Sequence, residues 1–257
     1  MIANYHTHTV RCNHASGTER EYIESAIKNG FKILGFSDHV PQPYPADFKS
    51  HIRMGMEEIE NYTDTLVKLR DEYKNQIQIL IGYETEYFPK YFDKLIKTIT
   101  QFPLDYIIQG QHFIPDEIEG FYAGHLTDEE QDLIDYAKLT VEGMQTGLFS
   151  YLAHPDLINY SGPDDIFQMH MRPVIQTAID MNIPLEVNML GFRTGRNYPC
   201  DRFFSLASSM GASFIIGCDA HNPVDVIQPE AAEGFVDFLN KHHITYGDNK
   251  LELRPVK

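Results

Sequence analysis

Cysteines, basic residues and long apolar runs are scarce in this 257-residue sequence. The three cysteines, Cys12, Cys200 and Cys218, form no closely spaced pair and leave an odd thiol in any pairing. This usage argues against a disulfide framework and suits a reducing compartment. No apolar stretch approaches the ~18 residues of a membrane span, and the first residues lack the basic start and apolar run of a signal peptide. We therefore expect a cytoplasmic protein with no membrane partner.

The charge balance is strongly acidic, with 21 Lys and Arg against 37 Asp and Glu and a formal net charge of -16. Proteins grip nucleic-acid backbones with clustered Lys and Arg, so this balance argues against a nucleic-acid partner. It would also repel a small anionic ligand, unless bound metal ions reverse the sign locally. Hydrophobic residues make up 42% of the chain, which is enough for a sizeable core.

The organisation of the chain favours one domain over residues 1–257, because no repeat, low-complexity tract or Gly/Ser linker interrupts it. Short apolar runs bounded by turn residues alternate with longer segments of helical spacing. The runs cover residues 2–9, 33–37, 77–83, 106–110, 149–153, 184–188 and 212–217. This alternation predicts an α/β fold, a single distorted (β/α) barrel with seven parallel strands joined by right-handed crossovers.

Two connections in this pattern have readable signals. Thr18 precedes Glu21 by three positions, a capping box that predicts a helix ending near Gly30. The stretch from Val40 to Met54 is proline-rich and lacks a helical period. It is predicted to be a long loop at the strand ends, either a lid or an ordinary connection.

Histidines and carboxylates gather at the predicted carboxyl ends of the strands. His6 and His8 are two residues apart on the first strand, which places both side chains on one face. The later runs end on or lead to His14, Asp38, His39, Glu84, His112, His154, Asp219 and His221. In a (β/α) barrel the catalytic groups come from this face, so we expect a metal site there.

A lone histidine is more often a core or surface residue than a ligand, but the joint placement of nine candidates at or just after the ends of several strands favours metal binding. Nine ligands exceed the four of one tetrahedral ion and suit two or three ions. His, Asp and Glu are compatible with Zn, Mn or Fe. Cys12 is interpreted as a packing residue beside this set. An amidohydrolase also carries H-x-H on its first strand, and a noncatalytic metal-binding module is a further alternative.

The motifs HTHT, RCNHASG, GFSDH, GYETEY, GQHF, YLAHPD, EVN and GCDAH cover nearly the whole chain. As a set they resemble the polymerase-and-histidinol-phosphatase (PHP) superfamily. Within it, RCNHASG, the Arg53-Met54 pair and the late Tyr198-Pro199 resemble the monofunctional histidinol-phosphatases.

The resemblance implies a trinuclear centre. In such a centre the first ion would bind to His6, His8, Glu84 and Asp219. The second ion would bind to His14, His39 and His221, and the third to Glu84, His112 and His154. Glu84 matches the family's G-x-E, whereas Glu86 lies on the same face two residues on and stays open as the bridging carboxylate.

The implied reaction is hydrolysis of a phosphate monoester, with L-histidinol phosphate in histidine biosynthesis as the expected substrate. A metal-bridging hydroxide would attack phosphorus while arginines neutralise the phosphoryl oxygens. Arg193 and Arg196 are the catalytic and phosphate-binding candidates, and Arg53 is a third substrate-binding one. Asp38, Asp219 or a metal-bound water would transfer the proton to the leaving group. Another small-molecule phosphoesterase of the superfamily is the closest alternative.

Overall fold

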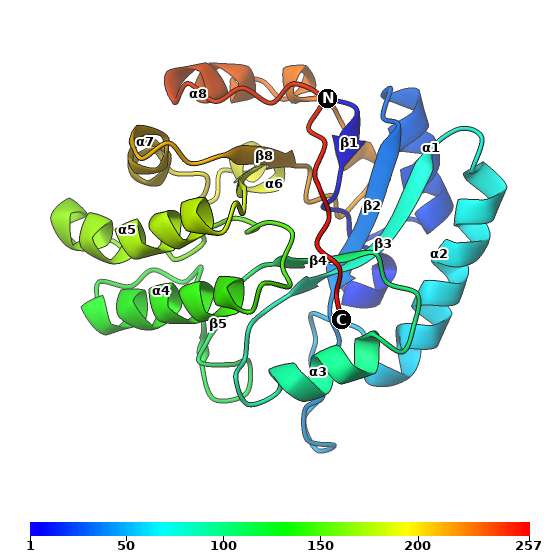
Figure 1. Cartoon of the computed structure of the whole chain (residues 1–257), viewed down its shortest axis with the longest axis horizontal. Coiled ribbons are helices and arrows are strands. Elements are labelled where there is room, and N and C mark those ends of the chain that lie inside the picture. The colour runs from blue at the N-terminus through cyan, green and yellow to red at the C-terminus, as the bar shows by residue number, and fades with distance from the viewer.

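The computed structural model describes residues 1–257 and alternates strands with helices along most of the chain (Figure 1). The strands are β1 (Ala3–Asn4), β2 (Ile33–His39), β3 (Gln78–Thr85), β4 (Tyr106–Gln109), β5 (Phe113–Ile114), β6 (Phe121–Tyr122), β7 (Leu185–Asn188) and β8 (Phe214–Gly217). The α-helices are α1 (Glu19–Lys28), α2 (Ile59–Tyr73), α3 (Phe92–Ile99), α4 (Glu130–Gln145), α5 (Asp164–Asp180), α6 (Met189–Thr194), α7 (Asp201–Ser209) and α8 (Phe235–Lys241). Four short 3-10 helices are η1 (Val10–Cys12), η2 (Met56–Glu58), η3 (Pro223–Asp225) and η4 (Pro229–Ala231). None of these helices is long and apolar enough to cross a membrane.

The central strands run parallel, as the alternating pattern predicts. β1, β2, β3 and β4 form one four-stranded parallel sheet in chain order, and β7 pairs with β8 in parallel. β5 and β6 form a separate antiparallel hairpin. In Figure 1 the sheet curls, with α1 and α2 on one side and α4, α5, α7 and α8 on the other. The α/β class and the curled parallel sheet are therefore confirmed.

No continuous strand forms over the predicted residues 149–153, although the segment hydrogen-bonds to β4 and to β7. Only Leu152 makes isolated parallel bridges, one to Gln109 of β4 and one to Leu185 of β7. Pro184 accepts from Leu152 N but has no N–H of its own to extend the pairing. His154, with φ 27°, turns the chain out of the extended region.

The first predicted strand, over residues 2–9, is shortened to Ala3–Asn4 for a different reason. The Asn4 side chain donates to His6 O at 3.2 Å and to Thr7 Oγ1 at 2.8 Å, and accepts from Cys218 N at 2.9 Å. These side-chain bonds compete with the backbone ladder. Beyond Asn4, a parallel bridge between Thr7 and Ala220 pairs this segment with the one that follows β8.

The helix predicted after Thr18 is confirmed. Thr18 and Glu21 form the reciprocal capping box, and α1 buries Tyr22, Ile23 and Ala26. By contrast, residues 40–54 contain no helix or strand, which confirms the predicted loop.

Strand alternation separates two apolar clusters. Ile79, Ile81 and Tyr83 of β3 belong to the large core of 55 buried residues. The opposite face contributes Leu80 to a cluster of eight that also includes Tyr5. Further along that opposite face lies Glu84, so one face of β3 is apolar at its start and carboxylate-bearing at its end.

The C-terminal segment, from Asn249 to the end of the chain, covers the smaller apolar cluster. It has no helix or strand and runs in red past the sheet in Figure 1. Asn249 donates to Ala3 O at 3.0 Å and to Ile216 O at 2.8 Å, which joins β1 to β8. Leu251 and Leu253 then pack on the cluster, and Leu251 N donates to Tyr5 Oη at 3.0 Å. The tail therefore closes the end of the molecule that carries the amino ends of the strands.

We expect the double variant Leu251→Ala/Leu253→Ala to lose about 2 kcal/mol of unfolding free energy, because both side chains are half-buried. Urea denaturation measures this loss. Glu252→Ala, at the exposed position between them, is the control and should lie within about 0.5 kcal/mol of the unmodified protein. Equal stability of the two variants would show that the tail contributes nothing to the core.

Candidate metal centre

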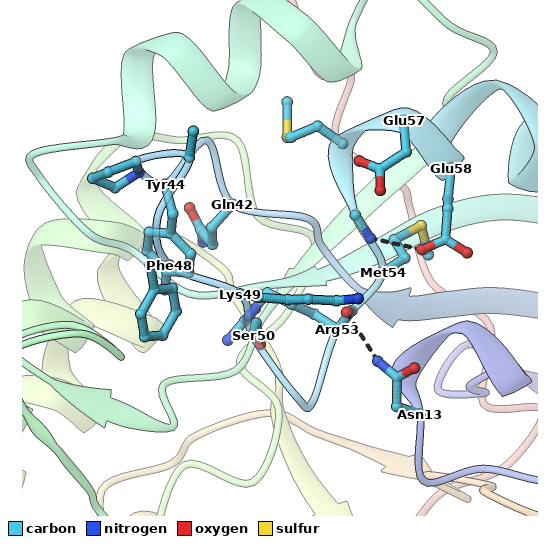
Figure 2. Close-up of a pocket in the computed structure, with 14 residues that line it drawn as sticks. Asn13, Gln42, Tyr44, Phe48, Lys49, Ser50, Arg53, Met54, Glu57 and Glu58 are labelled. Atoms are coloured by element: carbon cyan, nitrogen blue, oxygen red, sulfur yellow. Dashed lines mark hydrogen bonds between the residues drawn. The ribbon is translucent and has the colours of Figure 1, made fainter.

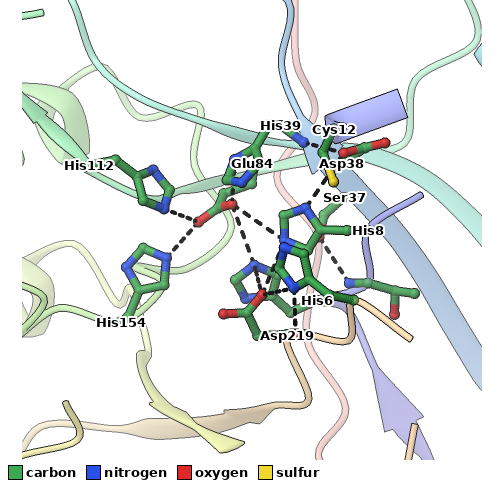
Figure 3. Close-up of polar contacts among 12 residues, drawn as sticks. His6, His8, Cys12, Ser37, Asp38, His39, Glu84, His112, His154 and Asp219 are labelled. Carbon is green, nitrogen blue, oxygen red and sulfur yellow. Dashed lines mark hydrogen bonds and ion pairs between the residues drawn. The ribbon is translucent and has the colours of Figure 1, made fainter. Parts of the chain in front are cut away.

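The nine side chains predicted as ligands come together, with seven histidines around the buried carboxylates of Glu84 and Asp219. Figure 3 labels all of them except His14 and His221. The nine side chains reach this place from the carboxyl ends of β2 and β3, from the segments that follow β1, β4 and β8, and, for His154, from the segment between α4 and α5. Parallel strands present these ends on one side of the sheet, so residues far apart in sequence meet there.

Glu84 lies at the middle of the cluster, and each of its oxygens faces a different group of histidines. Oε1 lies 2.6 Å from His154 Nε2 and 3.4 Å from His112 Nε2. Oε2 lies 2.9 Å from His39 Nδ1, 3.5 Å from His8 Nε2 and 3.6 Å from His6 Nε2. A carboxylate arranged in this way can be shared by two cations.

Asp219 closes the cluster on the other side. Its Oδ1 lies 3.1 Å from His8 Nε2, 3.5 Å from His6 Nε2 and 3.4 Å from His221 Nδ1. Asn188 donates to the second oxygen, Oδ2, at 3.0 Å, which fixes the carboxylate plane. Asp219 adopts φ 49°, a left-handed conformation that a non-glycine residue holds at a cost, as is common at functional sites.

Three histidines form another part of the cluster, in which His14 is exposed, His221 is partly buried and His39 is buried. His14 and His221 bring their Nε2 atoms within 3.0 Å, and their rings stack with centroids 4.7 Å apart. The ligand atoms of His14, His39 and His221 all lie within 4.8 Å of one another. Cys12 was interpreted as a packing residue, yet its Sγ forms another such group with His8 and His221.

Several buried atoms of the cluster lack any hydrogen-bond partner. They are His6 Nε2, His8 Nδ1 and Nε2, His39 Nδ1, His154 Nδ1 and Glu84 Oε2. Although His39 Nδ1 lies 2.9 Å from Glu84 Oε2, the geometry of the pair does not make a hydrogen bond. Unpaired buried polar atoms are costly, and most of these point at one another. Cations between them would satisfy both the imidazole lone pairs and the carboxylate, so the donor set fits divalent metal ions.

The charges of the cluster are strongly coupled. Burial raises the pKa of Glu84, but the surrounding histidines, His112 and His39 foremost, hold it well below its usual range. Burial also opposes a charge on His6, yet Glu186, Asp219 and Glu84 raise its pKa to about 10. Burial and the neighbouring His8 lower the pKa of His221 to about 3. The buried carboxylates therefore demand positive charge, which protons or metal ions can supply.

Glu186 is a functional residue that the sequence interpretation missed. Its Oε1 lies 2.7 Å from His6 Nδ1, and its Oε2 accepts from His154 N at 3.0 Å and Asn188 Nδ2 at 2.8 Å. A carboxylate on one imidazole nitrogen directs the other nitrogen toward a metal. The signal was present in the EVN motif, where Glu186 and Asn188 share one face of a predicted strand.

Asp38 and Glu86 have comparable positions behind the ligands. Asp38 accepts from Thr9 N at 3.2 Å and His39 N at 2.8 Å, and its Oδ1 lies 3.5 Å from His8 Nδ1. Glu86 Oε1 lies 3.2 Å from His112 Nδ1. Neither carboxylate lines the open cavity described next.

A cavity of about 320 Å³ opens beside the cluster. It is lined by His14, His39, Ile52, Glu84, His112, Phe113, Tyr122, His125, Arg196, Tyr198, Asp219 and His221. His125 is both exposed and part of this wall. The cavity thus has a charged floor and aromatic walls.

The three predicted phosphate-binding arginines have different surroundings. Arg196 lines the cavity, where its Nη1 donates to Tyr198 Oη at 2.7 Å. Arg193 lies outside it and pairs with Asp225 at 2.9 Å. Arg53 is buried and pairs with Glu86 and Glu117. Only Arg196 is placed to meet a ligand in the cavity.

Asp156, two residues after His154, contacts the segment that follows α6. Its Oδ2 accepts from Cys200 N at 2.6 Å, and the Asn197 side chain donates to Asp156 O. Burial raises the pKa of Asp156 to about 7. Asp156 therefore fastens the segment after α6 that carries Arg196.

Comparison with known proteins agrees with this geometry. The model of the PHP domain family matches residues 4–190. A probable histidinol-phosphatase of Deinococcus radiodurans is 30% identical over 240 residues, 88% of each chain. One of Schizosaccharomyces pombe is 27% identical over 265 residues, covering 92% of this chain and 86% of that one.

Solved structures share the fold. A putative histidinol phosphatase of Listeria monocytogenes superposes with a TM-score of 0.73 at 18% identity, over 90% of this chain and 99% of that one. The histidinol phosphate phosphatase of Lactococcus lactis, complexed with zinc, L-histidinol and phosphate, gives a TM-score of 0.71 at 18% identity over 97% and 98%. The extent of the family match and the similarity to the Deinococcus protein together show that this chain belongs to the PHP domain family.

Proposed function

We propose that this chain hydrolyses L-histidinol phosphate to L-histidinol and phosphate at a centre of two or three divalent metal ions. The observation that carries the proposal is the Glu84 carboxylate, whose two oxygens face separate histidine groups while Oε2 and several ring nitrogens have no other partner. Relatives named as probable histidinol-phosphatases support the choice of substrate.

Three groups of residues would hold the ions. We assign His6, His8, Glu84 and Asp219 to the first, His14, His39 and His221 to the second, and Glu84, His112 and His154 to the third. Support comes from overlapping groups of ligand atoms that lie within 4.8 Å of one another, and for His112 from its Nε2 atom, 3.4 Å from Glu84 Oε1. Zinc, manganese and iron all suit these donors, and the zinc complex of the Lactococcus lactis protein favours zinc.

When bound, the metal ions supply Lewis acidity and an activated water for in-line attack on phosphorus. Arg196 extends into the cavity from the wall and would donate to the phosphoryl oxygens, which carry charge through the transition state. Asp219 lines the same cavity and would relay a proton from a water molecule to the leaving alkoxide. Asp38 is enclosed by Thr9 and His39 and would act by orienting His8.

The remaining wall suits the organic part of the substrate. Phe113, Tyr122 and Ile52 provide apolar and aromatic surface for an imidazole ring. The acidic character of the protein favours the amine of histidinol, whereas the metal ions neutralise the phosphate. Phosphate binding by Arg53 and Arg193 stays a prediction. Their ion pairs with Glu86 and Asp225 argue against it.

The same proposal includes a single domain over residues 1–257 and a closed ring of seven parallel segments. It is supported by the bridges of Leu152 to Gln109 and Leu185, and of Thr7 to Ala220, which link the two sheets into one circuit. The continuous core of 55 residues supports one domain.

Phosphate release from a panel of substrates tests the proposal, with metal content measured on the same preparation. L-histidinol phosphate should exceed glycerol phosphate and sugar phosphates by at least ~10-fold in kcat/KM, about 1.4 kcal/mol of transition-state binding. Comparable rates on all of them would indicate another phosphoesterase of the family. Bound metal without phosphate release from any substrate would indicate a noncatalytic metal-binding module.

Glu84→Gln should abolish activity and lower metal content, because a neutral amide cannot serve as a shared anionic ligand. Glu86→Gln should be milder, since Glu86 contacts His112 Nδ1 and Arg53 rather than the centre of the cluster. Metal analysis and steady-state kinetics on both variants measure the difference. Equal or reversed losses would assign the bridging role to Glu86.

Arg196→Met should reduce kcat/KM by roughly 30- to 150-fold, or ~2–3 kcal/mol, because it removes one charge-assisted contact with the transition state. Metal content should stay unchanged, since arginine does not ligate these ions. Arg193→Met should cost less, because its guanidinium is paired with Asp225 outside the cavity. A larger loss for Arg193→Met would assign the phosphate contact to that residue instead.

A further inference from the structure

Arg53 occupies a buried junction between the long loop and the metal centre. Its side chain is only 1% exposed, although it lies at the end of the loop over residues 40–54. Figure 2 shows it among the residues that line a cavity of about 640 Å³ formed largely by that loop. A guanidinium has five N–H donors in a rigid fork, so a buried one needs several fixed acceptors.

One side of the guanidinium faces the metal centre. Nη1 and Nη2 each donate to an oxygen of Glu86, both at 2.8 Å. Glu86 Oε1 also lies 3.2 Å from His112 Nδ1. The Glu86 carboxylate, which already accepts from Arg53, can also accept from an N–H at His112 Nδ1, and that contact would leave the lone pair of His112 on Nε2. That nitrogen faces Glu84 Oε1 at 3.4 Å, on the metal side of the ring.

The other side of the guanidinium holds the loop. Arg53 Nε donates to Glu117 Oε2 at 2.7 Å, and Nη1 donates to Val40 O at 3.1 Å. Glu117, in the turn between β5 and β6, also accepts from Ser50 Oγ at 2.5 Å and Tyr44 Oη at 3.3 Å. The guanidinium of Arg53 thus contacts the start of the loop at Val40. Its partner Glu117 contacts Ser50 and Tyr44 within the loop.

Asn13 adds a contact on the backbone of the same residue. Its Nδ2 donates to Arg53 O at 3.2 Å, drawn as a dashed line in Figure 2. Asn13 immediately precedes His14, and Ile52 immediately precedes Arg53. Both His14 and Ile52 line the cavity of the metal centre, so the loop is fastened where it forms part of that wall.

The charges of the junction make the three side chains interdependent. Two carboxylates and one guanidinium share a site that excludes water, and burial of an unpaired carboxylate is unfavourable. Without Arg53, Glu86 would lose the two N–H donors that hold its carboxylate toward His112.

We propose that Arg53 is a positioning residue that couples the loop over residues 40–54 to His112, acting through Glu86 on the metal side and through Glu117 on the loop side. The inference rests on the proposed metal site. In this role Arg53 does not make the contact with phosphate that the sequence predicted. It links the cavity wall to His112, one of the proposed metal ligands.

The test measures two properties on the full chain loaded with zinc, neither of which is enzyme activity. Zinc affinity is determined by competition with a chelator, and the loop is probed by trypsin cleavage after Lys49, which is exposed. Arg53→Met should lower the affinity for the most weakly held zinc by about 10- to 100-fold and should accelerate cleavage. Arg53→Lys keeps the charge without the fork and should give intermediate values.

Two further variants separate the sides of the junction and keep the proposal testable should Arg53→Met fail to fold. Glu117→Gln should accelerate cleavage after Lys49 but leave zinc affinity within about twofold, because it does not touch His112. Glu86→Gln should lower zinc affinity with a smaller effect on cleavage. This pattern, together with the Arg53→Met result where it folds, supports the coupling.

Unchanged zinc affinity in Glu86→Gln, or equal losses of affinity in Glu117→Gln and Glu86→Gln, would overturn the inference. An unmodified chain that binds no zinc, manganese or iron would overturn the proposed metal centre and the coupling with it. The two failures are distinguishable, because the first leaves metal binding by the unmodified chain intact.

Discussion

A buried carboxylate surrounded by histidines is the constraint on which the arrangement of this molecule depends. Glu84 is 1% exposed and has five imidazole rings within 3.6 Å of its oxygens. In a low-dielectric interior such a group is tolerated only with positive charge beside it. Each ring must therefore be held in place, and Glu186, Glu86 and Asp38 do this from behind. The result is a negatively charged framework prepared for cations.

The barrel-like core supplies the rigidity that this framework requires. The inner face of β3 begins with Leu80 in an apolar cluster, passes Gly82 and ends with Glu84. A Cβ on Gly82 would lie 2.5 Å from the Tyr106 ring, so only glycine leaves room for that side chain. Tyr106 Oη then donates to Tyr5 O at 2.6 Å and ties β4 to the segment leading to His6. Packing below the metal centre thereby sets the distances within it.

The sequence was sufficient for the parallel α/β order, the capping box of α1 and the gathering of His6, His8 and Glu84, because these follow from strand periodicity and local capping. It was insufficient where side chains replace the backbone ladder, as at Asn4, or where single bridges replace a strand, as at Leu152. The orienting role of Glu186 also escaped it. An acidic residue inside a short apolar run shows neither its partner nor its burial until the strands are assembled.

Arginine shows the same limit more sharply, since its function is decided by the charges it meets. Three arginines follow predicted strands at their carboxyl ends, and sequence alone cannot separate them. Arg53 meets two carboxylates in the interior, Arg193 meets Asp225 outside the cavity, and Arg196 meets a tyrosine hydroxyl in the cavity wall. A guanidinium that is already paired with a carboxylate gains little free energy by binding phosphate. One that contacts only a neutral hydroxyl keeps an uncompensated positive charge. In a protein of net charge -16, an uncompensated cation beside the histidine cluster is the feature that an anionic substrate would find.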